Sequence, residues 1–242
     1  MKRSWIPMVI AVVVGVFLVA PAGAMQSASD LYLKAQKESI MFKRVELYTE
    51  ALEKNPSLAD AHRERGILYY YQGKHEKAIA DLTSYLQQGG ADHRVYFYRA
   101  LARLSQGMLP GALEDLSAAH RIQPKDSEVL SYRAQVLYDL GRWDEARQDA
   151  AQVLRLHDDA VSMARALNVQ ARIYAAQGKD LLARENFKRA AALDPTLGVF
   201  RAWADYLSPE QASRVGMMAL IVLPLVLIFR LSLPKPKRNK DE

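Results

Sequence analysis

The chain has 242 residues, half of them apolar and a quarter charged, a composition that excludes a largely disordered protein. Its formal charge of +6 lies mostly at the ends, because residues 1–24 carry +2 and residues 230–242 carry +3, which leaves +1 for the rest. A near-neutral middle disfavours nucleic-acid binding, which needs a broad positive surface. The absence of cysteine excludes disulfides and anchoring through a lipidated cysteine.

Residues 1–24 have the features of an export signal. Lys2 and Arg3 precede an apolar run from Met8 to Val19, and the run is followed by Ala22-Gly23-Ala24, the small-x-small pattern that signal peptidase accepts. We interpret residues 1–24 as a signal peptide that is cleaved after Ala24. An uncleaved anchor helix is the alternative.

The middle of the chain is repetitive. Four glycines are separated by 34, 34 and 37 residues, and an alanine follows each glycine five places later. Apolar residues also recur at intervals of three and four, which is typical of one face of a helix. A period of this length indicates stacked helical hairpins that bury one another's apolar faces. The glycine and alanine pairs are Gly73 and Ala78, Gly107 and Ala112, Gly141 and Ala146, and Gly178 and Ala183.

This 34-residue unit resembles the tetratricopeptide repeat, which has a small residue on its first helix, glycine at the turn, alanine on its second helix and a closing proline. The resemblance covers about 170 residues and implies an all-α helical-hairpin solenoid of about five units that binds a protein or peptide partner. The first copy departs from the pattern, with Ser39 at the turn and Arg44 at the packing alanine, and Val161–Met163 are extra residues before the last copy. The predicted units of the solenoid (25–197) are 25–58, 59–92, 93–126, 127–160 and 164–197. Besides the glycine and alanine pairs above, the match rests on Gly66, Tyr69 and Leu82; Ala100, Leu116, Ala119 and Pro124; Ala134, Leu137 and Ala150; and Ala171, Tyr174, Phe187, Ala190 and Pro195.

Three consecutive units carry an arginine on the first predicted helix and an aspartate sixteen residues later on the second. The same two places hold two amides in the last unit and two leucines in the first. Because a buried charge without a partner is costly, residue types that match at the two positions indicate that these positions are in contact. We therefore predict ion pairs within the repeats and exclude these arginines from ligand contacts. The pairs are Arg65 with Asp81, Arg99 with Asp115 and Arg133 with Asp149, and the uncharged versions are Gln170 with Asn186 and Leu31 with Leu47.

The resemblance also implies a binding groove on the concave side, formed by five places of each first helix. In this chain those places are aromatic and mixed in charge, which suits a peptide or helix with an apolar anchor. They lack the lysines and asparagines with which part of the family clamps a terminal carboxylate. Packing in the interior is the alternative for the tyrosines, and we predict it for Tyr69 and Tyr96. The predicted groove residues are Arg63, Ile67, Tyr70, Tyr71, Arg94, Phe97, Leu101, Gln135 and Tyr138, with Tyr98 and Tyr132 at its border.

We predict no catalytic residue, cofactor or metal site, and therefore no enzyme. The five histidines are scattered, there is no nucleophilic cysteine, and no glycine-rich phosphate loop occurs. Asp158 and Asp159 lie at a predicted inter-repeat turn, where we expect them to face solvent.

The end of the chain is expected to cover and anchor the array. Residues 198–207 are predicted to form a capping helix over the last repeat. Residues 208–233 are predicted to form a transmembrane helix around the apolar run from Val215 to Phe229, with a buried core helix as the alternative. The basic tail at 234–242 is expected to be cytoplasmic.

These features predict a membrane-anchored scaffold or adaptor in a bacterial inner membrane, with its repeats facing the periplasm. Its expected partner is a protein, bound for the assembly of an envelope complex. The alternatives are a self-associating structural protein and an accessory subunit of an envelope enzyme, and homo-oligomers stay open.

Overall fold

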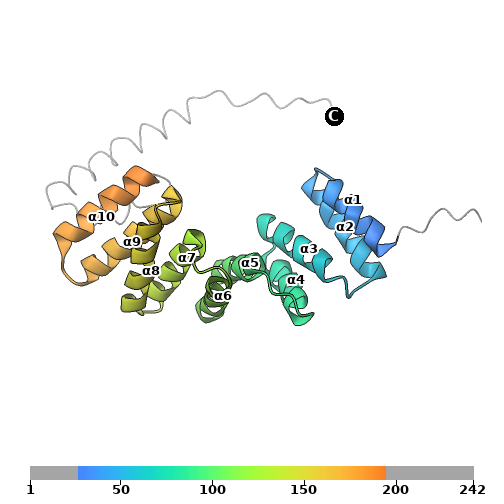
Figure 1. Cartoon of the computed structure of the whole chain (residues 1–242), viewed down its shortest axis with the longest axis horizontal. Helices are drawn as coiled ribbons and strands as arrows, with labels where there is room; N and C mark the ends of the chain where they lie inside the picture. Colours follow the sequence, from blue (N-terminus) through green and yellow to red (C-terminus); the bar gives the residue numbers. More distant parts are fainter. Residues whose placement is uncertain (1–26, 195–242) are drawn as a thin grey trace, which may run out of the picture. The chain divides into compact units, whose positions relative to one another are not determined.

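The computed structural model describes residues 27–194, and all regular structure in that range is helical (Figure 1). The all-α prediction is confirmed for these residues. The predicted segments 1–24, 198–207, 208–233 and 234–242 lie outside them, and no helix within 27–194 is long and apolar enough to cross a bilayer. The helices are α1 (Ala28–Lys37), α2 (Met41–Lys54), α3 (Ala59–Tyr71), α4 (His75–Gln87), α5 (His93–Ser105), α6 (Leu109–Ile122), α7 (Ser127–Asp139), α8 (Trp143–Leu156), α9 (Ala160–Ala176) and α10 (Asp180–Leu193).

The chain divides into two compact units after Leu58. In the first unit, α1 and α2 pack as a hairpin around fully buried Ala35, Tyr48 and Ala51. A capping box starts α1, because Ser27 Oγ accepts from the Asp30 backbone N–H at 3.1 Å and the Asp30 carboxylate accepts from the Ser27 N–H at 3.0 Å. The hairpin therefore forms despite the atypical Ser39 and Arg44.

The second unit contains four helix pairs, α3–α4, α5–α6, α7–α8 and α9–α10, in which each pair packs on the next. Small residues allow the helices to approach closely. A Cβ on Gly66 would lie only 2.8 Å from the Leu82 side chain, so α3 and α4 touch at the backbone here. The alanine after each turn is fully buried, which explains why it recurs: Ala78, Ala112, Ala146 and Ala183.

The four turn glycines all have positive φ, between 69° and 77°. At the first turn, the N–H of Gly73 donates to the Tyr70 carbonyl at 2.9 Å and the N–H of Lys74 donates to the Tyr69 carbonyl at 2.9 Å. These bonds satisfy the last carbonyls of α3 and reverse the chain, in a conformation that a side chain would strain.

The extra residues Val161–Met163 lengthen α9, which has 17 residues where α7 has 13. The preceding helix ends at His157, which has φ of 53° and is a non-glycine residue in the left-handed region. Asp158 and Asp159 follow it, and each accepts a hydrogen bond, so they are structural residues and not merely solvated charges.

The three predicted ion pairs are confirmed. Each arginine donates through two nitrogens to both carboxylate oxygens, at 2.7 and 2.8 Å in the first pair, 3.0 and 2.6 Å in the second, and 2.7 Å twice in the third. The carboxylates are almost buried, so these arginines are unavailable to a ligand. The sequence did not predict three further contacts: Arg103 Nη1 to Asp115 at 2.9 Å, Arg99 Nη1 to Thr83 Oγ1 at 3.0 Å, and His62 Nδ1 to Asp81 at 2.9 Å.

Candidate functional site

Five aromatic side chains from the first helices of three successive repeats form one contiguous patch. Neighbouring rings lie 5.4–5.7 Å apart between centroids, in tilted or edge-on orientations that favour aromatic contacts. We call this patch the aromatic cluster. It consists of Tyr70 and Tyr71 on α3, Phe97 and Tyr98 on α5, and Tyr132 on α7.

The cluster presents both ring surface and hydroxyls. Tyr71 is 58% exposed, whereas Phe97 is only 7% exposed and lies beneath Tyr98 and Tyr132. The hydroxyls of Tyr71 and Tyr98 are 2.6 Å apart, and this hydrogen bond raises the pKa of Tyr71 to about 12. Burial raises the pKa of Tyr70 as well. The three tyrosines of α3 and α5 are therefore held in place, and both shifted phenols stay neutral at physiological pH.

Three of the predicted groove residues offer little surface to a ligand. Ile67, Phe97 and Leu101 are 9%, 7% and 7% exposed, because each packs into the core that its repeat shares with the next. The remaining predicted residues are partly or fully exposed: Arg63, Tyr70, Tyr71, Arg94, Tyr98, Tyr132, Gln135 and Tyr138.

Tyr69 and Tyr96 are partly buried, so the prediction that they lie in the interior is met only in part: Tyr96 packs against the buried cluster of α5, α6 and α7. Cationic groups stand 5.6–5.8 Å from the Tyr69 ring centroid, supplied by Arg65, Lys74 and Lys77. Arg99 stands 5.9 Å from the ring of Tyr96. Both rings therefore also contact the aliphatic and cationic parts of neighbouring side chains.

Two arginines on α9 contact tyrosine rings of α7, and these contacts were not predicted from the sequence. Arg165 is 8% exposed, with Cζ 3.9 Å from the Tyr132 ring centroid and Nη1 donating to Ser131 Oγ at 2.8 Å. Arg172 stands 4.0 Å from the Tyr138 ring centroid, whose other neighbour is the stacked ring of Trp143. Both arginines occupy groove places of the repeat, second and ninth, so extending the same rule to residues 164–197 would have found them.

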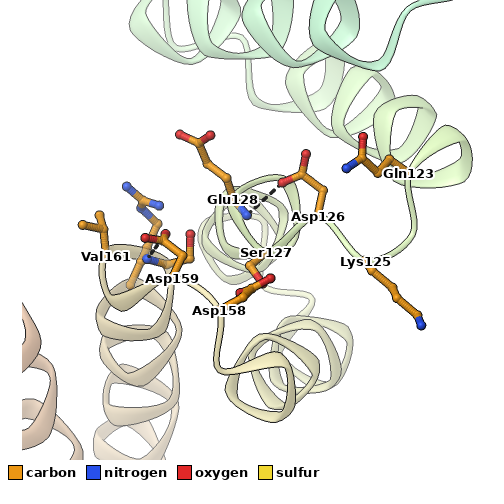
Figure 2. A pocket seen from close by; sticks show the side chains of 10 residues that line it. Gln123, Lys125, Asp126, Ser127, Glu128, Asp158, Asp159 and Val161 are labelled. Atoms are coloured by element: carbon orange, nitrogen blue, oxygen red, sulfur yellow. Dashed lines mark hydrogen bonds between the residues drawn. The ribbon is translucent and has the colours of Figure 1, made fainter.

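A cavity of about 550 Å³ lies between the starts of α7 and α9 (Figure 2). Two of its four carboxylates cap helices: Asp126 accepts from the backbone N–H groups of Glu128 and Val129 at 3.0 and 3.1 Å, and Asp159 accepts from that of Ser162 at 2.8 Å. The cavity is lined by Gln123, Lys125, Asp126, Ser127, Glu128, Asp158, Asp159, Val161, Ser162 and Arg165.

The cavity is acidic, with four carboxylates and two basic side chains on its walls. Asp158 accepts from Ser127 Oγ, which leaves Glu128 as the carboxylate that makes no hydrogen bond or ion pair within the described range. Burial, followed by the negative charge of Asp126, raises the pKa of Glu128. Among residues 27–194 no group of three or more histidine, aspartate or glutamate side chains is placed to hold a metal ion.

Replacing Asp159 with alanine is expected to lower the free energy of unfolding by about 0.5–2 kcal/mol, because α9 loses its cap. The hydrogen bond from Ser162 lowers the pKa of Asp159. Its stabilising contribution is therefore present above the unfolded pKa and lost as pH falls through the folded one. Urea unfolding at neutral and acidic pH tests this, with Asp159→Asn as a variant that retains a cap. An alanine variant of unchanged stability at neutral pH would contradict the assignment.

Two models of the tetratricopeptide repeat match the chain, one over residues 126–196 and the other over 45–92 and 64–127. Together they cover more than half of the sequence, in the range where the helix pairs repeat. The chain belongs to the tetratricopeptide repeat (TPR) family. No curated protein matches the chain.

Solved TPR structures share this fold. YrrB, described as a TPR protein with an unusual peptide-binding site, is 20% identical, with a TM-score of 0.64 over 72% of this chain and 90% of YrrB. A TPR protein from Parabacteroides merdae is 21% identical, with a TM-score of 0.63 over 86% of this chain and 81% of its own. PilF of Pseudomonas aeruginosa is 20% identical, with a TM-score of 0.59 over 75% of this chain and 83% of PilF. Identities this low establish the TPR fold alone.

Proposed function

We propose that this TPR protein is a scaffold that binds a protein or peptide partner through the aromatic cluster. The observation that carries the proposal is the contiguity of the patch, in which side chains from α3, α5 and α7 present accessible rings and hydroxyls. Rigid, partly buried aromatic side chains are the usual energetic centres of protein interfaces. TPR proteins generally mediate protein–protein interactions, and the family's repeats present such side chains on a rigid array.

The chemistry of the surface suits a partner with an apolar anchor beside a basic residue. The anchor would contact the rings of Tyr71 and Tyr98, whose bonded hydroxyls hold the two rings together. Glu128 lies one helical turn before Tyr132 on α7, so its carboxylate is near the cluster. Burial, the phenols of Tyr132 and Tyr98, and lastly the charge of Glu128 raise the pKa of Tyr70. A lysine or arginine of the partner would give Glu128 an ion pair in addition to the nearby charge of Arg165.

We further propose that the scaffold is held in a bacterial inner membrane by residues 208–233, with its repeats in the periplasm and the tail at 234–242 in the cytoplasm. The support comes from sequence: the export features of residues 1–24, the apolar run, and the basic residues that follow it. A membrane anchor would raise the local concentration of the scaffold around membrane partners and favour assembly of an envelope complex.

Photo-crosslinking from position 71 in intact membranes tests partner binding. Tyr98→Ala is expected to weaken binding of the captured partner by about 2 kcal/mol, roughly 30-fold, because it removes the central ring of the cluster and leaves the Tyr71 hydroxyl without its bond. The affinity is measured by titration with the identified partner.

Tyr69→Ala is the matched control, since Tyr69 is also on α3 but lies outside the cluster. It should leave the affinity unchanged. Equal losses in Tyr98→Ala and Tyr69→Ala would overturn the assignment of the binding surface. Capture of a second copy of the chain, and of nothing else, would favour the self-associating alternative.

A further inference from the structure

The tip of the α1–α2 hairpin is exposed and apolar. Three consecutive side chains at this tip, Ile40, Met41 and Phe42, are 48%, 38% and 66% exposed, and Leu33 in the middle of α1 is 52% exposed. None of the four belongs to the core of the hairpin, which is built from Leu31, Ala35, Leu47, Tyr48, Ala51 and Leu52.

The tip is also cationic. Residues 34–44 contain four basic side chains and one acidic one, a formal charge of +3. Lys34, Lys37 and Lys43 are all exposed. The one carboxylate, Glu38, accepts a hydrogen bond from the backbone N–H of Ile40 at 2.9 Å, and this bond lowers its pKa. Its charge is therefore tied to the start of α2, and the turn that presents the apolar residues is held in a defined conformation.

No other hairpin within residues 27–194 combines these two properties at its tip. The equivalent eleven-residue segments 68–78, 102–112, 136–146 and 173–183 have formal charges of +1, +1, −2 and 0. The residues that correspond to Ile40-Met41-Phe42 in those segments are Lys74-His75-Glu76, Met108-Leu109-Pro110, Arg142-Trp143-Asp144 and Lys179-Asp180-Leu181. The composition of the first tip is thus not a requirement of the repeat.

We infer that the α1–α2 tip docks on the surface of an anionic phospholipid membrane, with Phe42 and its neighbours inserted among the headgroups and the lysines against the lipid phosphates. Apolar residues ringed by lysine are typical of membrane-interface segments. Anionic lipids attract each nearby lysine or arginine favourably. A protein partner is the poorer fit, because lysine is depleted in protein–protein interfaces.

This second contact rests on the proposed anchoring but is separate from the aromatic cluster. Membrane binding by a tip is local and reversible, and becomes strong when a second signal already holds the chain at the bilayer. The tip would then orient the first hairpin relative to the membrane surface, whereas the anchor would hold the protein at the membrane.

Site-specific labelling tests the inference, and the chain offers a simple route because it contains no cysteine. The full-length Ser39→Cys variant carries an environment-sensitive fluorophore at the exposed turn, which leaves the apolar residues intact. It is reconstituted into vesicles with and without phosphatidylglycerol, and into vesicles that contain shallow spin-labelled lipids. The matched controls carry the label at Glu76→Cys, in the tip of the next hairpin, or at Glu53→Cys, at the far end of α2.

In anionic vesicles we expect the fluorescence emission of the label at position 39 to shift to the blue and to be quenched by the spin-labelled lipids. We expect neither change for a label at position 76 or 53. In the labelled Ser39→Cys background, Lys37→Gln should lower the ratio of inserted to free label about fivefold, the factor that corresponds to about 1 kcal/mol per basic residue. Phe42→Gln should abolish the blue shift without unfolding the hairpin, because this side chain is 66% exposed.

The outcomes separate the tip from the anchor. If the chains float with the vesicles but the fluorescence of the label at position 39 does not differ from that of the controls, the docking of the tip is overturned and the membrane anchor is supported. Chains that fail to float with anionic vesicles would overturn the anchor, and the tip with it, because the tip binds strongly only beside an anchor. A blue shift that grows with the protein-to-lipid ratio would overturn lipid docking in favour of contact with a second copy.

Discussion

Asp115→Ala is expected to lower the free energy of unfolding by about 3–5 kcal/mol, because it removes the shared partner of two arginines. The Asp115 side chain is 3% exposed, and those of Arg99 and Arg103 are 12% and 19% exposed. Two guanidinium groups would be left with little water and no carboxylate. Thermal and urea unfolding of the full chain measure the loss, and the affinity for the crosslinked partner should not change.

Glu145→Ala is the control for this variant, since the Arg142–Glu145 pair is about half exposed on both sides. It should leave the free energy of unfolding nearly unchanged, because water screens an exposed ion pair. The first repeat supplies another check, because it has Leu31 and Leu47 at the positions of the ion pair. The double variant Arg133→Leu, Asp149→Leu should be more stable than Asp149→Ala alone. An Asp115→Ala protein of normal stability that fails to bind its partner would place these arginines in the binding site.

Phe187→Ala is expected to cost about 3–5 kcal/mol, with the damage concentrated in α9 and α10. Phe187 is 1% exposed and, among the described residues, is the one aromatic member of the buried cluster of this pair, which also contains Ala164, Leu167, Ala171 and neighbouring alanines. Each repeat contacts only its neighbours, so loss of one core loosens its own hairpin first. Hydrogen exchange followed by mass spectrometry should show lower protection in residues 160–193 than in 59–122.

Leu181→Ala is the matched control on the same helix, because Leu181 is 81% exposed. Its protection pattern should equal that of the unaltered chain. Uniform loss of protection across residues 59–193 in Phe187→Ala would show instead that the four hairpins unfold as one cooperative unit.

The structure divides the predicted groove residues into accessible and buried ones. Tyr70, Tyr71, Tyr98 and Tyr132 are accessible, as expected for amphipathic rings, and three of them are in direct ring contact. The other apolar residues at the predicted groove places are not accessible. Ile67, Phe97 and Leu101 are buried, because the next repeat covers them. The position of a residue within its repeat does not determine how closely the next repeat packs against it.

The sequence by itself determined the helical hairpins, their turns and the ion pairs within them. These features depend on contacts within one 34-residue unit, so glycine, alanine and matched charges at fixed intervals report them directly. Only the tertiary structure decided what two or more repeats share: the joining of tyrosines from α3, α5 and α7, the placing of Arg165 over Tyr132, and the acidic cavity between α7 and α9. These depend on the stacking of separate units, which is set by the packing of their side chains and not by the period of the chain.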